Sequence, residues 1–223
     1  MGYRDDCILG FEELYSMSRK NNQIIVFERI KPKQIRAIHT RDIIFEAAAR
    51  IIEEQGVGAL NTNAIAARAG ISIGTLYGHF ANKEAILVSM ARRQLECDEE
   101  ATLRALSCQA EPGTSRVRVV IRTLIDLHLT RPEVRRAIMA SHTANGFADE
   151  GQAVVRRAVD RIISWRAAAG RPHTDSTAMF LATRGVIGLL RAAFEEASPL
   201  LGMARFEDEL IALAEGCFAR AGT

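Results

Sequence analysis

The chain has 223 residues and a formal net charge of +2, with 48% apolar, 6% aromatic and 25% charged residues. This length leaves room for one small domain and one larger domain. The four cysteines form no CxxC pair and no His/Cys cluster with zinc-ligand spacing, so we expect neither a metal nor a cofactor. There is no signal-peptide pattern and no run of about 18 apolar residues, and we therefore expect a cytoplasmic protein without membrane contact.

Residues 1–37 do not share the pattern of the rest, and we expect them to form a flexible N-terminal extension with a basic arm. The cations at its end have no acid among them; they are Arg29, Lys31, Lys33, Arg36 and Arg41. Pro32 is expected to break any early helix in this segment. Residues 29–41 are either a solvated linker or an arm whose cations reach a phosphate backbone, and the sequence leaves both open.

Three helices are expected next, over residues 41–55, 62–69 and 73–80. Thr40 can cap the first helix, and Gly56 and Gly58 end it. Thr62 lies near the N-cap of the second helix. Gly70 can take the left-handed conformation that ends this helix, and Ser72 is a good N-cap for the third. The expected core members of this small unit are Phe45, Leu60, Ile65, Leu76 and Phe80.

The third helix is unusual because Gly74 and Gly78 lie four residues apart on one face. Each costs roughly 1 kcal/mol of helix stability relative to alanine. Close approach of the helix backbone to a DNA groove would offset that cost. Thr75 offers a hydroxyl and a methyl group to a base edge, while Tyr77 and His79 can reach phosphate oxygens.

A fourth helix begins at Lys83, with Asn82 as its cap, and runs towards Gln109. Lys83 lies in the first turn, where its ammonium and the free N–H groups of the helix could together hold a phosphate.

The run from Ile38 to Met90 resembles the DNA-binding domain of the TetR family of bacterial transcriptional repressors. The segments AAARIIEEQG (47–56) and IAARAGISIGTLYGHFANKEAIL (65–87) look like that family's signature. The family often carries a larger side chain at the position of Gly78. From the residues and the resemblance together we predict ten DNA-binding residues, which are Arg41, Thr62, Asn63, Ser72, Gly74, Thr75, Tyr77, Gly78, His79 and Lys83.

The same stretch contains G-x-S-x-G at residues 70–74, the nucleophile elbow of α/β-hydrolases. That elbow needs a strand before the serine, whereas a helix is expected here. A serine hydrolase stays an alternative, but we predict that the chain is not an enzyme.

The second half is expected to be all-α, with helices over residues 115–130, 132–139, 151–169 and 175–197 and one further helix at the end. We therefore predict an all-α fold with a three-helix helix-turn-helix DNA-binding domain (38–84) and a larger helical ligand-binding and dimerisation domain (85–223). The helix over residues 175–197 is apolar on more than one side, and the final helix carries a matching apolar stripe. In the family such a pair forms a four-helix dimer interface, which here would use Leu181, Gly185, Leu189, Ala192, Phe206, Leu210, Leu213 and Cys217. The alternative is that these residues are the core of a monomer.

The resemblance also implies a small-molecule pocket in the second domain. The candidate residues are Arg122, His128, Met139, His142, Phe147, Trp165, Phe180 and Arg184. The sequence thus predicts a homodimeric TetR-type repressor that binds a palindromic double-stranded DNA operator and is released by a small-molecule effector. An α-helical ligand-binding protein without DNA binding is the other alternative.

Overall fold

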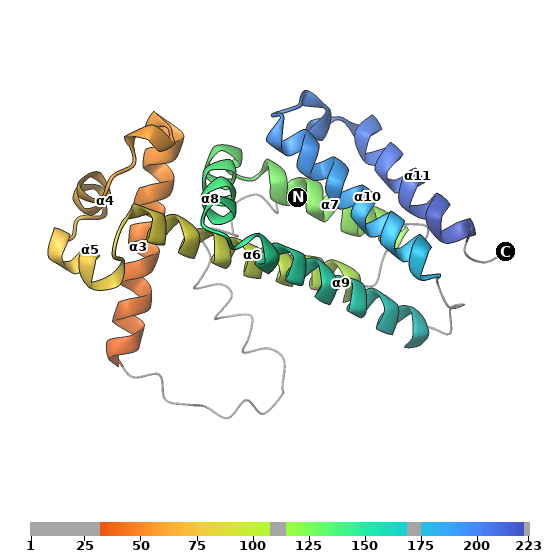
Figure 1. The fold of residues 1–223 in the computed structure, drawn as a ribbon, viewed down its shortest axis with the longest axis horizontal. Coiled ribbons are helices and arrows are strands. Elements are labelled where there is room, and N and C mark those ends of the chain that lie inside the picture. Colours follow the sequence, from red (N-terminus) through yellow and green to blue (C-terminus); the bar gives the residue numbers. More distant parts are fainter. Residues whose placement is uncertain (1–31, 108–114, 169–174, 221–223) are drawn as a thin grey trace. The chain divides into compact units, whose positions relative to one another are not determined.

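The computed structural model describes residues 32–107, 115–168 and 175–220, which form helices and turns without a strand (Figure 1). The described residues divide into two compact units. The first comprises the described residues up to Gln94 together with Glu133–Asn145, and the second comprises Leu95–Pro132 and the residues from Gly146 onwards. The predicted all-α fold is confirmed.

The first unit is built from α3 (Pro32–Gln55), α4 (Thr62–Ala69), α5 (Ile73–His79), the first part of α6 (Lys83–Ser107) and α8 (Pro132–Ala144). A short 3-10 turn, η1 (Val57–Ala59), joins α3 to α4. All five predicted core residues are buried. The rings of Phe45 and Phe80 lie 5.7 Å apart between centroids, so they tie α3 to the end of α5.

The start of α3 differs from the prediction. The helix begins at Pro32 and not at Arg41, because proline suits the first turn of a helix, where its missing N–H would have had no partner. Thr40 lies inside the helix and donates its hydroxyl to the carbonyl of Arg36 at 2.8 Å. Residues 32–37 of the expected flexible extension are therefore helical, and residues 1–31, with Arg29 and Lys31, lie outside the described residues.

Helix α8 packs into the core of the first unit, although the predicted boundary after residue 84 places it in the second domain. Val134 and Ile138 are buried in the same apolar cluster as α3 and α5. The helix runs to Ala144, beyond the predicted end at Met139. The connection to the next helix is correspondingly short, because α9 (Ala148–Ala168) begins at Ala148, before the predicted start at residue 151.

The second unit contains the rest of α6, α7 (Arg116–Leu129), α9, α10 (Ser176–Glu195), the 3-10 turn η2 (Pro199–Gly202) and α11 (Ala204–Arg220). Helices α7, α10 and α11 share an apolar core, whose members include Ile121, Val186, Leu190, Leu210 and Ala214. Ion pairs also join α7 to α11: Arg118 of α7 lies 2.9 Å from Asp208 of α11 and 3.2 Å from Glu207. Arg157 of α9 pairs with Glu99 of α6.

Among the described helices, α10 has the length and mean hydropathy of a membrane span. The sequence of this helix contains no uninterrupted apolar run of that length, because Arg184 and Arg191 interrupt it. One such helix is weak evidence of a membrane contact, since the core helix of a helical domain has the same properties. The buried residues of α10, among them Val186 and Leu190, pack in the core that α7 and α11 share.

Candidate nucleic-acid interface

Helices α4 and α5 are joined by the tight turn that the sequence predicts. Gly70 ends α4 in the left-handed region, with φ 67° and ψ 29°. Ser72 caps α5, and its Oγ accepts the backbone N–H of Thr75 at 3.0 Å. The N-cap of α4 is Asn61 and not Thr62: its Oδ1 accepts the N–H of Ala64 at 2.9 Å. Thr62 is instead the first residue of the helix.

The outward face of α5 is bare backbone. Leu76 is fully buried, and residues two positions before and after it lie about 160° away around an α-helix. Those residues are Gly74 and Gly78, and both are exposed. A Cβ atom added to Gly78 would meet nothing within 4 Å, and one added to Gly74 would meet only Ser72 Oγ, at 3.8 Å. The fold of the free chain therefore does not require glycine at either position.

Hydroxyl groups flank this bare face on both sides. Thr75 is exposed, and its Oγ1 lies 2.8 Å from Ser72 Oγ. Tyr77 is 54% exposed, and its phenolic oxygen lies 3.2 Å from Thr62 Oγ1, so the ring is held against the start of α4. Hydroxyl groups can both donate and accept hydrogen bonds, and here they lie beside exposed helix backbone. This arrangement suits a partner that presents many polar groups.

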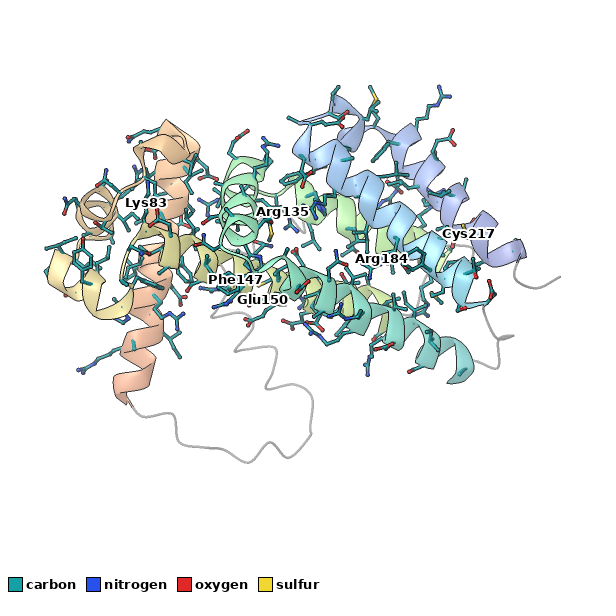
Figure 2. The ribbon with its side chains drawn as sticks, in the orientation of Figure 1. Lys83, Arg135, Phe147, Glu150, Arg184 and Cys217 are labelled. Carbon is teal, nitrogen blue, oxygen red and sulfur yellow. The ribbon has the colours of Figure 1, made fainter. Side chains whose placement is uncertain are left out.

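Cationic side chains lie near the C-terminal end of α5. Lys83 is the first residue of α6 (Figure 2), and Asn82 caps that helix by accepting the N–H of Ala85 at 2.8 Å. The guanidinium of Arg41 lies 5.6 Å from the centroid of the Phe80 ring, where α5 ends. The His79 ring lies 6.4 Å from the same ring. Asn63 is exposed in the first turn of α4. All ten predicted DNA-binding residues thus lie in the first unit.

Two ion pairs join α4 and α6 to α3, and the sequence did not predict either of them. Arg68 of α4 forms a bidentate pair with Glu54 of α3. The hydrogen bond from Arg68 lowers the pKa of the Glu54 carboxyl, and the same hydrogen bond raises the pKa of the Arg68 guanidinium. Arg93 of α6 pairs with Asp42 of α3. Partners this far apart in sequence leave no periodic signal.

The predicted dimer residues fall into two groups. Leu181, Leu189 and Leu213 are exposed by 54%, 47% and 40%, and Ala192 is also exposed. Leu210 is only 2% exposed and belongs to the chain's own core, against which Phe206 and Cys217 pack in part. Gly185 lies under Leu213, whose Cδ2 would be 3.4 Å from an added Cβ.

The predicted effector residues are divided between the two units. Met139 and His142 lie on α8 in the first unit, and His142 is buried.

The others with described side chains lie in the second unit. His128 Nδ1 lies 2.7 Å from the carbonyl of Leu124, and its ring meets Phe194 edge-on. Arg184 donates to Gln152 of α9, and Arg122 pairs with Glu207. Phe147 is half-buried and Phe180 is exposed. The side chain of Trp165 lies outside the described part of the chain.

The nucleophile-elbow alternative does not fit this geometry. Helix α4 precedes Ser72, whereas the elbow needs a strand. The hydroxyl of Ser72 is engaged as a helix cap.

Comparisons with known proteins agree with the first unit as described. Residues 44–90 match the family model of the bacterial regulatory proteins of the tetR family. The HTH-type transcriptional regulator SAB2452 of Staphylococcus aureus is 39% identical over 59 residues, which are 26% of this chain and 32% of that protein. The match thus spans about a third of the length of that relative. Both descriptions are of regulatory proteins and neither is of an enzyme, in agreement with the prediction that this chain is not an enzyme.

Two solved structures share the fold over most of both chains. A putative TetR-family transcriptional regulator from Mesorhizobium loti has a TM-score of 0.62 and 20% identity, and the match covers 83% of this chain and 98% of that one. The SmeT–triclosan complex has a TM-score of 0.54 and 25% identity, with 81% and 94% covered.

Proposed function

We propose, because residues 44–90 match the tetR family of bacterial regulatory proteins, that this chain is a transcriptional repressor that acts as a homodimer. It binds a palindromic DNA operator in the cytoplasm and is released by a small-molecule effector. The observation that carries the proposal is the outward face of α5, where two exposed glycines lie between the hydroxyls of Thr75 and Tyr77.

That face has the properties of a helix that enters the major groove. Without side chains at Gly74 and Gly78, the backbone of α5 can approach the floor of the groove closely. Thr75 then meets a base edge, where its hydroxyl and methyl groups can distinguish bases. Tyr77 and Thr62 present hydroxyls to phosphate oxygens, which fix the position of the helix without carrying sequence information.

The cations near the C-terminal end of α5 fit phosphate groups. Lys83 combines an ammonium group with the N-terminus of α6, where free N–H groups favour an anion. Arg41 lies beside the end of α5. A modest net charge of +2 does not oppose DNA binding, because the local gathering of charge matters more than the total.

A dimer is supported by the exposed apolar side chains of the last two helices. Leu181 and Leu189 of α10 and Leu213 of α11 stay 40% or more exposed in the single chain. Each leucine that becomes fully buried contributes about 1.5–3 kcal/mol at most, so pairing these faces about a two-fold axis favours association. A two-fold dimer presents two α5 helices to half-sites about 34–36 Å apart, or a multiple of that distance, and so requires a palindrome.

Release by an effector needs a ligand that binds the DNA-incompetent state better, with a coupling free energy of about 1–3 kcal/mol. Helix α6 contributes residues to both units and is the element through which a ligand in the second unit acts on the first. The SmeT complex holds triclosan, and by analogy we propose a small organic effector for this chain. The candidate pocket residues of the second unit include His128 and Arg184.

The test is selection of bound duplexes from a random DNA pool, with the native mass of the recovered complex measured in parallel. We expect a palindromic consensus held by one dimer or by two. Failure to recover a consensus with folded, dimeric protein would contradict DNA recognition and favour an α-helical ligand-binding protein.

A further inference from the structure

The hydroxyl of Ser72 makes two contacts within the chain, both with the same residue. Its oxygen accepts the backbone N–H of Thr75 at 3.0 Å, which caps α5. The same oxygen lies 2.8 Å from Thr75 Oγ1, so the two hydroxyls share a second hydrogen bond. A serine that only capped the helix would need the first contact alone.

The second contact controls the side chain of Thr75. Threonine in a helix divides between two χ1 rotamers, because its hydroxyl can bond the carbonyl three or four residues earlier. Here the hydroxyl bonds Ser72 instead, which selects one rotamer and fixes the direction of both the hydroxyl and the methyl group. Thr75 is exposed and has no burial of its own to hold it in place.

We propose that Ser72 is a positioning residue for base recognition: it holds Thr75 in the rotamer that determines which base α5 prefers. The inference rests on the proposed function, and it assigns to Ser72 a role through Thr75 in addition to the cap. One of the two hydroxyls donates to the other. If Ser72 donates, Thr75 keeps its own hydrogen to donate to the base; if Thr75 donates, it can only accept from the base.

Asn61 is the matched control for this role. It caps α4 in the same unit with the same geometry, since its Oδ1 accepts the N–H of Ala64 at 2.9 Å. Its amide group donates to the carbonyl of Ala59. Loss of the Asn61 side chain therefore removes a cap of the same kind without releasing Thr75.

The experiment measures the base preference of the full chain at every operator position by competition between single-base variants of the selected duplex. Thr75→Ala identifies the base pair that Thr75 recognises. Ser72→Gly removes the hydroxyl but retains most of the capping, because glycine at an N-cap costs only a few tenths of a kcal/mol relative to serine. Ser72→Thr retains the hydroxyl.

We expect Ser72→Gly to lower discrimination at that base pair by at least about threefold in both half-sites, which is part of what one good base contact supplies. Asn61→Ala should leave the preference unchanged, and Ser72→Thr should restore it. An unchanged preference in Ser72→Gly, or a Thr75→Ala variant that alters no position, would overturn the assignment while the operator still stands. If the unmodified chain selects no operator, the proposed function fails and this inference falls with it.

Discussion

Gly78→Ala should stabilise the protein and weaken its binding to DNA. Glycine inside a helix costs about 0.5–1 kcal/mol relative to alanine. Gly78 has an ordinary helical φ, and an added Cβ would meet nothing within 4 Å, so the new methyl causes no strain in the free chain. Because α5 ends one residue later, at His79, we expect a gain near the lower limit, about 0.5 kcal/mol.

The same methyl group lies on the face that we propose enters the groove. Extra methyl groups in a well-packed contact cost about 1–3 kcal/mol each. A dimer carries two copies, so the loss of binding free energy should be at least about 2 kcal/mol, or roughly a 30-fold increase in Kd. The change in stability and the change in affinity therefore have opposite signs.

Unfolding in urea, followed by circular dichroism, gives the stability, and fluorescence anisotropy with the selected operator gives Kd at fixed salt. Ala67→Gly is the control, because Ala67 is exposed on α4. It should lower stability by up to about 1 kcal/mol and leave Kd unchanged. A Gly78→Ala variant that is more stable and binds the operator with unchanged Kd would refute close approach of the α5 backbone.

Three further predictions concern charge, assembly and pH. Lys83→Ala should lower affinity similarly for all duplexes and reduce the slope of log K against log salt by about one. Arg205→Ala, on α11, is the control and should leave the slope unchanged. An unchanged slope in Lys83→Ala would show that Lys83 does not contact a phosphate. Leu189→Glu should shift the native mass from dimer to monomer without unfolding the chain, since Leu189 is 47% exposed. A Leu189→Glu variant that stays as dimeric as the unmodified chain would show that the interface lies elsewhere. The hydrogen bond from Arg157 lowers the pKa of Glu99 below its ordinary value of 4.5, so its stabilisation is present above pH 4.5 and is lost as pH falls through the lowered folded value. In urea unfolding at several pH values, Glu99→Gln should lose less stability on acidification than the unmodified chain, and equal losses would contradict this pair's role.

Much of the candidate interface was predictable because its signals are local. The left-handed Gly70, the Ser72 cap and the buried Leu76 are each specified within a few residues, and the structure places all three as expected. The error at the N-cap of α4 is one residue, since Asn61 and Thr62 are both good capping types. The hydrogen bond between Tyr77 and Thr62 joins residues 15 positions apart and has no local signal.

The helical fold and the helix-turn-helix were predictable from sequence, because caps, turns and apolar spacing act between neighbours along the chain. Which apolar residues the chain buries in its own core became clear only from the packing of the helices. Val134 of α8 is buried in the core of the first unit, and Leu210 in that of the second. Leu213 on the same helix stays 40% exposed. A helix that is apolar on several sides gives no periodic signal for one side over another, so only packing against distant segments separates a core residue from one left at the surface.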